Sequence, residues 1–164
     1  MPGVRFSLVP ILVLSLAIAS STGAQTAGSP ARSDSLSFDE FRGATTVLVF
    51  YRSGDCGLCR ERLRALDEYL DDYDDLGVKV VVLTADPPDG IERVRDELGL
   101  DLWIEHADRA MLARWGVWPE GADAPFPAAF ALDEAGQVRF RHVGESAADR
   151  VSDEVLLAAA RRAR

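Results

Sequence analysis

Short apolar runs alternate along this chain with longer amphipathic segments, and this order restricts the fold more than any other feature of the sequence. Residues 45–51 are β-branched and aromatic with little alternation, which is typical of a strand buried on both faces. Similar runs predict strands at 45–51, 78–83, 102–104, 128–132 and 138–143. Apolar residues at helical spacing predict helices over 58–73, 87–98, 108–115 and 148–162.

The connections between these segments favour a mixed sheet. A helix joins the first two strands, so they are predicted to be parallel. The turn at 133–136 joins the last two strands as an antiparallel hairpin. Gly77 is expected to end the first helix, and the prolines at 87–88 to open the second. We therefore predict an α/β fold with a central mixed sheet of four to five strands flanked by helices.

Length and charge set the broad class of the protein. A chain of 164 residues suits one domain and can bury a core without a disulfide framework. Its 18 basic and 27 acidic residues give a net charge of −9, which argues against a nucleic-acid partner because phosphate binding needs a basic field. Small and polar residues at 25–36 predict a flexible lead-in, followed by the domain at 37–164.

The first 24 residues have the three-part layout of a secretory signal. Arg5 precedes an apolar run over 6–19, and small residues follow at 20–24. The run is shorter than the roughly 20 residues of a membrane span. We expect cleavage after Ala24 and export to the periplasm or the medium, with no stable membrane insertion afterwards. An uncleaved N-terminal anchor is the alternative.

Cys56 and Cys59 are the only cysteines in the chain, and they lie between a buried strand and the start of a helix. Free backbone N–H groups and the helix dipole favour a thiolate there. Cys56, expected nearer to solvent, would attack a disulfide, and Cys59 would resolve the mixed disulfide. Arg60 and Arg52 are candidates for lowering the thiol pKa further, whereas Asp55 opposes them.

Two other readings of the cysteine pair stay open. The pair is compatible with a purely structural disulfide, although so short a loop would constrain the unfolded chain little. A metal site would need His106 and His142, which lack the regular spacing of zinc ligands. Two cysteines exclude a disulfide-rich scaffold and a four-cysteine zinc site. We expect no metal and no cofactor.

Two segments resemble a known family. Residues 49–60 are similar to the active-site segment of redoxins, and more closely to the alkyl hydroperoxide reductase/thiol-specific antioxidant family in its thioredoxin-like C-x-x-C branch. Residues 127–140 resemble that family's Pro-x-x-Phe-x-(Ile/Leu)-Asp-x-x-Gly hairpin. The resemblance implies a thioredoxin-like fold in which Pro127 is a cis-proline facing the cysteines and Phe126 contacts the substrate. A trans loop proline is the alternative.

The departures from the family pattern bear on the activity. Peroxiredoxins carry Pro-x-x-x-Thr-x-x-Cys, and alignment through 50–51 places Cys59 at the peroxide-attacking position, Cys56 on the threonine and Arg52 on the proline. The family's peroxide-orienting arginine falls about where Pro127 stands. The residues that support peroxide activation are therefore replaced.

Thioredoxin itself differs from this chain before the first cysteine. Asp55 stands where thioredoxin usually has tryptophan, and Phe50 stands where it has a buried aspartate. Without that carboxylate, deprotonation of Cys59 needs another base or water.

Three functions follow from these residues. The first is an extracytoplasmic thiol–disulfide oxidoreductase that uses a Cys56–Cys59 redox-active disulfide and acts, as a monomer, with a protein dithiol or disulfide partner. The second is a peroxiredoxin-like antioxidant peroxidase, in which Cys59 or Cys56 attacks peroxide. The third is a non-enzymatic binding module on a thioredoxin scaffold. Its partner surface would be aromatic and would comprise Trp103, Trp115, Trp118 and Phe126, although core packing is the simpler explanation for Trp103.

Overall fold

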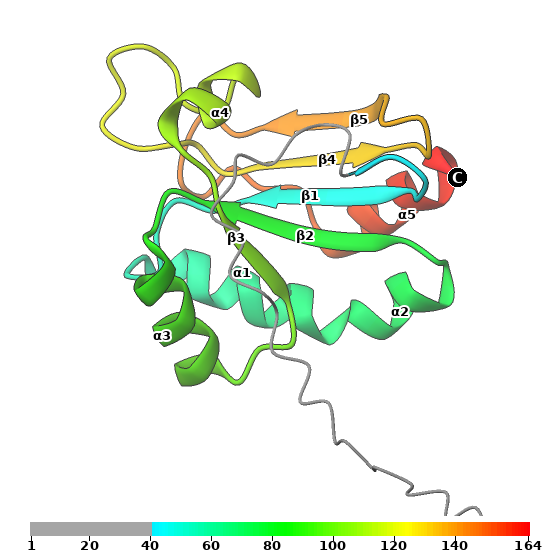
Figure 1. Cartoon of the computed structure of the whole chain (residues 1–164), viewed down its shortest axis with the longest axis horizontal. Coiled ribbons are helices and arrows are strands. Elements are labelled where there is room, and N and C mark those ends of the chain that lie inside the picture. The colour runs from blue at the N-terminus through cyan, green and yellow to red at the C-terminus, as the bar shows by residue number, and fades with distance from the viewer. Residues whose placement is uncertain (1–40) are drawn as a thin grey trace, which may run out of the picture. The chain divides into compact units, whose positions relative to one another are not determined.

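The computed structural model describes residues 41–164, so the expected signal segment at 1–24 and lead-in at 25–36 lie outside the described residues. Figure 1 shows a mixed sheet of five strands in the order β3-β2-β1-β4-β5. The strands are β1 (Thr46–Phe50), β2 (Lys79–Thr84), β3 (Trp103–His106), β4 (Ala128–Leu132) and β5 (Val138–Val143). The prediction of a mixed α/β sheet flanked by helices is confirmed.

The strand directions also agree with the sequence. β1 pairs in parallel with β2, and β2 with β3, whereas β4 is antiparallel to both β1 and β5. The last residue of β1, Phe50, pairs with Leu83 of β2. The segments that follow β1 and β2 therefore leave the sheet side by side, at the edge where the carboxyl ends of the parallel strands meet.

Five helices accompany the sheet: α1 (Gly57–Glu68), α2 (Leu70–Asp75), α3 (Pro88–Leu98), α4 (Arg109–Arg114) and α5 (Asp153–Ala163). Side chains of α1, α2, α3 and α5 pack with Val47 and Val49 in one core. Side chains of α4 pack with Leu48 and Phe50 in a second core. Successive residues of β1 thus face opposite cores, which explains why the strand is apolar throughout.

Two predicted helices differ from the observed ones. The helix predicted over 58–73 is interrupted at Tyr69, whose amide bonds to Leu66 O at 3.1 Å and whose hydroxyl bonds to Glu154. The last helix starts at Asp153 rather than 148, because Ser152 caps it by accepting from the amide of Val155. Residues 144–152 consequently form a loop between β5 and α5.

Gly77 ends the second of the two helical pieces, as predicted. It has φ +65°, and its amide donates to Asp74 O at 2.8 Å. No helix within residues 41–164 has the length and apolar character that a membrane crossing requires.

Candidate active site

The two cysteines occupy different positions at the start of α1. Cys56 is the N-cap residue with extended backbone, and its carbonyl accepts from the amides of Cys59 and Arg60 at 3.0 Å. Cys56 is partly exposed, whereas Cys59, in the first turn, is 0% exposed and faces the core. Both are free thiols. One sulfur is therefore accessible to a substrate and the other lies behind it.

The environments of the two thiols push their pKa values in opposite directions. Burial opposes ionisation of Cys56, but hydrogen bonds with Cys59 and the charge of Arg150 outweigh it, so the pKa of Cys56 is lowered. Burial raises the pKa of Cys59, and its hydrogen bond to Cys56 raises it further. Cys56 is thus the thiol of the pair that ionises more readily, and Cys59 the one that holds its proton more firmly.

Arg150, which lies on the loop before α5, supplies the positive charge of this site. Its Nη2 donates to Cys59 Sγ at 3.4 Å, and its Nη1 donates to Leu58 O. Its Nε donates to Ala147 O at 2.9 Å, which fixes the side chain on its own loop. Sequence reasoning missed Arg150, because no motif surrounds it and the contact with Cys59 spans 91 positions.

The arginines expected to assist the cysteines point elsewhere. Arg60 donates to Gly54 O at 3.2 Å and forms an ion pair with Glu97 at 2.8 Å. Arg52 is exposed, and it is its backbone, not its guanidinium, that bonds to Cys59; burial raises the pKa of that thiol, and this bond only partly opposes the rise. Asp55 is exposed and lies 3.7 Å from Arg93, a weak surface pair.

Pro127 lies beside the site, but the expected cis-proline is wrong: residues 41–164 contain no cis peptide bond. The amide of Phe126 donates to Val117 O at 2.7 Å, and Pro127 O accepts from Gly144 at 2.9 Å. With these groups satisfied, the chain enters β4 through the trans bond that X-Pro sequences prefer by about 0.5–1 kcal/mol. Phe126 is half-buried, and its amide is not free for a substrate strand.

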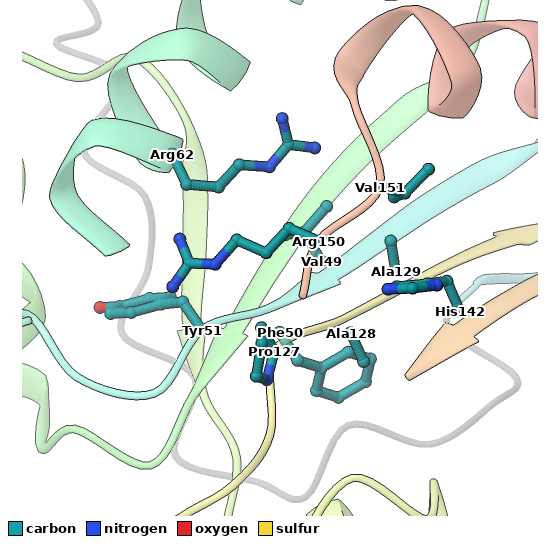
Figure 2. Close-up of a pocket in the computed structure, with 10 residues that line it drawn as sticks. All are labelled: Val49, Phe50, Tyr51, Arg62, Pro127, Ala128, Ala129, His142, Arg150 and Val151. Carbon is teal, nitrogen blue, oxygen red and sulfur yellow. The ribbon is translucent and has the colours of Figure 1, made fainter. Parts of the chain in front are cut away.

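A small pocket opens between β1, β4 and the loop that carries Arg150. Figure 2 shows the Arg150 side chain extending between Arg62 and the Tyr51 ring. The walls are mostly apolar, and the lining residues are Val49, Phe50, Tyr51, Arg62, Pro127, Ala128, Ala129, His142, Arg150 and Val151. Neither cysteine lines the pocket, but Arg150, which donates to Cys59 Sγ, belongs to its wall.

The aromatic residues proposed as a partner surface do not form one patch. Trp115 is buried against Phe50 and Phe130, with ring centroids 5.7 and 4.8 Å away. Trp103 is 38% exposed on β3, so the expectation that it packs in the core is wrong. Trp118 is half-buried under the guanidinium of Arg109.

The two histidines make their polar contacts with groups other than the cysteines. His106 Nδ1 is 2.9 Å from Asp86 O, and His142 Nε2 is 3.2 Å from Asp149 Oδ1. Within residues 41–164 no three metal-ligating side chains come together.

Comparison with known proteins places this geometry in a redox family. The model of the AhpC/TSA family matches residues 24–141. A Mycobacterium tuberculosis protein whose name places it among the peroxiredoxins is 24% identical over 112 residues, which cover 64% of this chain and 71% of that protein. The matched residues include Cys56 and Cys59.

Solved structures share the fold. The bacterioferritin comigratory protein of Xanthomonas campestris, studied for alkyl peroxide reduction, superposes with a TM-score of 0.68 at 18% identity, over 79% of this chain and 86% of its own. A Chlorobium tepidum protein described as a thiol:disulfide interchange protein of the DsbE type superposes with a TM-score of 0.59 at 22% identity, over 76% and 85%. The thioredoxin-like fold is thereby confirmed.

Proposed function

The chain belongs to the AhpC/TSA family, and from this premise we propose that it is a thiol–disulfide oxidoreductase in which Cys56 attacks and Cys59 resolves. The observation that carries the proposal is the contrast between the two sulfurs. Cys56 is partly exposed with a lowered pKa, whereas Cys59 is fully buried with a raised pKa. An accessible thiolate backed by a protected thiol is the arrangement that dithiol exchange requires.

The proposed reaction transfers two electrons to a substrate disulfide. The Cys56 thiolate attacks one substrate sulfur, forms a mixed disulfide, and expels the other substrate sulfur as a thiolate. Cys59 then attacks Cys56 Sγ, so that a Cys56–Cys59 disulfide forms and the second substrate sulfur leaves. A protein dithiol restores the reduced pair, and one chain is sufficient for the cycle. Run in reverse, the same steps oxidise a substrate dithiol.

The activity is tested by reduction of insulin disulfides with dithiothreitol as the electron source. We expect wild-type protein to accelerate the reaction and Cys56→Ser to abolish the acceleration. Unchanged acceleration in both Cys56→Ser and Cys59→Ser would contradict the proposal. The direction of the reaction in the cell follows from the reduction potential of the pair, near roughly −270 mV for a thioredoxin-like reductant and near roughly −120 mV for a strong oxidant.

Peroxidase activity is a second candidate, favoured by one observation. Arg150 Nη2 donates to the sulfur of Cys59 at 3.4 Å. Cys59 is the residue that aligns with the peroxide-attacking cysteine of peroxiredoxins. A guanidinium there would stabilise a Cys59 thiolate and hydrogen-bond a peroxide oxygen. After a short pulse of hydrogen peroxide, mass spectrometry of Cys56→Ser would find Cys59 as a sulfenic acid if this candidate is correct, and an unmodified thiol if it is not.

We also place the protein outside the cytoplasm, on the basis of the apolar run and small residues before Ala24. N-terminal sequencing of full-length protein expressed in a bacterium is the test. Mature protein starting near residue 25 in the periplasmic fraction would support export, and an intact N-terminus in the cytoplasm would contradict it.

A further inference from the structure

The positive charge at the cysteine pair depends on where the loop 144–152 places one side chain. Arg150 Nη2 donates to Cys59 Sγ at 3.4 Å, and its Nη1 donates to Leu58 O. Holding so long a side chain in one conformation costs entropy. The contacts that fix the loop therefore determine how often the guanidinium lies on the sulfur.

Asp149, the residue before Arg150, makes most of those contacts. Its Oδ2 accepts from the amide of Glu145 at 2.9 Å, and its own amide donates to Ser146 O at 3.2 Å, so the loop is closed on itself. On the other side, its Oδ1 lies 3.2 Å from Nε2 of His142 in β5, and its backbone oxygen lies 3.5 Å from the same nitrogen. An ionised carboxylate only accepts, so Nε2 is the donor. Asp149 thus joins the loop to the sheet.

The backbone of the loop also packs tightly on the sheet. The amide of Gly144 donates to Pro127 O at 2.9 Å, beside the start of β4. A Cβ at Gly144 would overlap Asp149 O and would lie 3.2 Å from Pro127 Cγ. His142 itself is fixed by the pairing of β5 with Ala129 of β4. The sheet therefore sets the position of Asp149, and with it the point from which the Arg150 side chain starts.

His142 can act on the cysteines only through the loop. Figure 2 shows the Arg150 side chain extending away from His142, toward Tyr51. The Nε of Arg150 donates to Ala147 O at 2.9 Å, inside the loop segment that the bonds of Asp149 close. The direction of the guanidinium thus follows from the same closed segment.

We propose that His142 and Asp149 are positioning residues, and that their hydrogen-bonded pair holds Arg150 on Cys59. The inference rests on the proposed dithiol function, in which the charge of Arg150 favours the thiolate of the pair. When the His142–Asp149 pair is broken, the loop samples other conformations and the guanidinium spends less time at the sulfurs. Cys56 then becomes a weaker nucleophile, although no group that touches it has been replaced.

The rate at which iodoacetamide alkylates Cys56 at pH 7 tests this proposal, with peptide mapping to identify the modified cysteine. We expect His142→Ala to slow the alkylation at least about threefold, and Arg150→Met to slow it at least as much. Absorbance at 240 nm during a pH titration should show the thiolate of both variants forming at higher pH than in wild type. Unfolding cannot imitate this result, because it would expose Cys59 to the reagent as well.

Asp149→Ala separates positioning from electrostatics by the sign of its effect. The substitution removes a negative charge near the site, which by Coulomb's law alone favours a thiolate and speeds alkylation. Loss of the loop contacts has the opposite effect. We expect Asp149→Ala to be slower than wild type. Glu145→Ala is the matched control, because it removes a carboxylate from the same loop but keeps the amide that bonds to Asp149. It should not be slower than wild type.

A double-mutant cycle shows whether His142 acts through Arg150. Once the guanidinium is absent, its position no longer matters, so His142→Ala/Arg150→Met should be no slower than Arg150→Met alone. His142→Gln should recover most of the rate lost in His142→Ala, because its side-chain amide can still donate to Asp149.

Three results would overturn the proposal: a wild-type rate in His142→Ala, a rate above wild type in Asp149→Ala, or slowing in the double variant that equals the product of the two single effects. Each of them leaves the dithiol function standing, because that function is judged separately by insulin reduction and its loss in Cys56→Ser. A wild-type protein that reduces no insulin would overturn the dithiol function itself.

Discussion

The guanidinium of Arg150 lies 3.4 Å from the sulfur of Cys59, 91 residues earlier in the chain. The same guanidinium donates to Leu58 O, within the first turn of α1. The loop before α5 is thus fastened to the turn that carries the cysteines. The positive charge at the site comes from this loop, and not from the arginines next to the cysteines in sequence.

Replacing Arg150 should weaken the nucleophile. In Arg150→Met, the pKa of Cys56 should rise toward the ordinary thiol value, because the charge that favours the thiolate is gone. Iodoacetamide should then alkylate the protein severalfold more slowly at pH 7. Absorbance at 240 nm during a pH titration reports the thiolate directly. Arg60→Met is the control, since Arg60 is paired with Glu97, and it should titrate like wild type. Equal effects of both variants would contradict the role given to Arg150.

The pH dependence of alkylation should identify Cys56 as the lower-titrating thiol. The rate should be low while Cys56 is protonated and should rise with a midpoint below the ordinary pKa of a thiol, because the pKa of Cys56 is lowered. Cys59 should react only at higher pH, because burial raises its pKa. Peptide mapping after alkylation at several pH values checks both statements. Modification of Cys59 before Cys56 would contradict them.

The ion pair between Arg62 of α1 and Asp153 of α5 should stabilise the fold. Both side chains are only 11% exposed, so Arg62→Met leaves a carboxylate poorly solvated and should lower the free energy of unfolding by about 2 kcal/mol at pH 7. Urea unfolding measures this loss. Arg62→Met/Asp153→Leu should recover most of it, because neither charge then remains buried.

The same pair gives a defined pH dependence. Burial raises the pKa of Asp153, and Arg62 opposes the rise. A raised carboxyl pKa means that the folded state binds more protons, so protonation of Asp153 favours folding; this contribution is fully present below the ordinary pKa of aspartate, about 3.9, and is lost as pH rises through the folded value. Without Arg62 the pKa of Asp153 should be raised further, so acid neutralises the unpaired carboxylate and the stability gap between Arg62→Met and wild type should narrow as the pH is lowered. A gap that widens in acid would contradict the assignment.

Gly54 should tolerate no side chain. A Cβ at this position would overlap Cγ2 of Val94 in α3 and would approach Asp86 Oδ2 to 3.3 Å. Gly54→Ala should lower the free energy of unfolding by about 2 kcal/mol, and Val94→Ala should partly relieve the clash. A double-mutant cycle on thermal unfolding should show that the two losses are less than additive. Strict additivity would mean that the two side chains do not compete for the same space.

Local patterns predicted most of the fold. Each of the five observed strands overlaps its predicted range, because a β-branched apolar run leaves the chain few alternatives. The helical interruption at Tyr69 was not predictable from spacing, since apolar periodicity continues through it. Helix α5 begins at Asp153 rather than at 148 because of a single capping bond at Ser152, and the spacing of apolar residues does not reveal that bond.

The candidate site was predictable only in part. Cys56 and Cys59 are close in sequence, so a turn between strand and helix places them together. Arg150 and Asp86 lie on loops distant in sequence and contact Cys59 and Gly54. No local sequence pattern predicts such contacts. A proline motif alone does not determine the isomer of the bond before Pro127, which is trans in the structure.

Trapping of mixed disulfides tests most directly whether Cys56 attacks and Cys59 resolves. Reduced Cys59→Ser and Cys56→Ser proteins would each be mixed with a disulfide-bonded substrate such as insulin, quenched in acid and analysed by mass spectrometry without reductant. We predict a stable adduct between substrate and Cys56 in Cys59→Ser, and none in Cys56→Ser. An adduct on Cys59 in Cys56→Ser, with none on Cys56 in Cys59→Ser, would contradict the account.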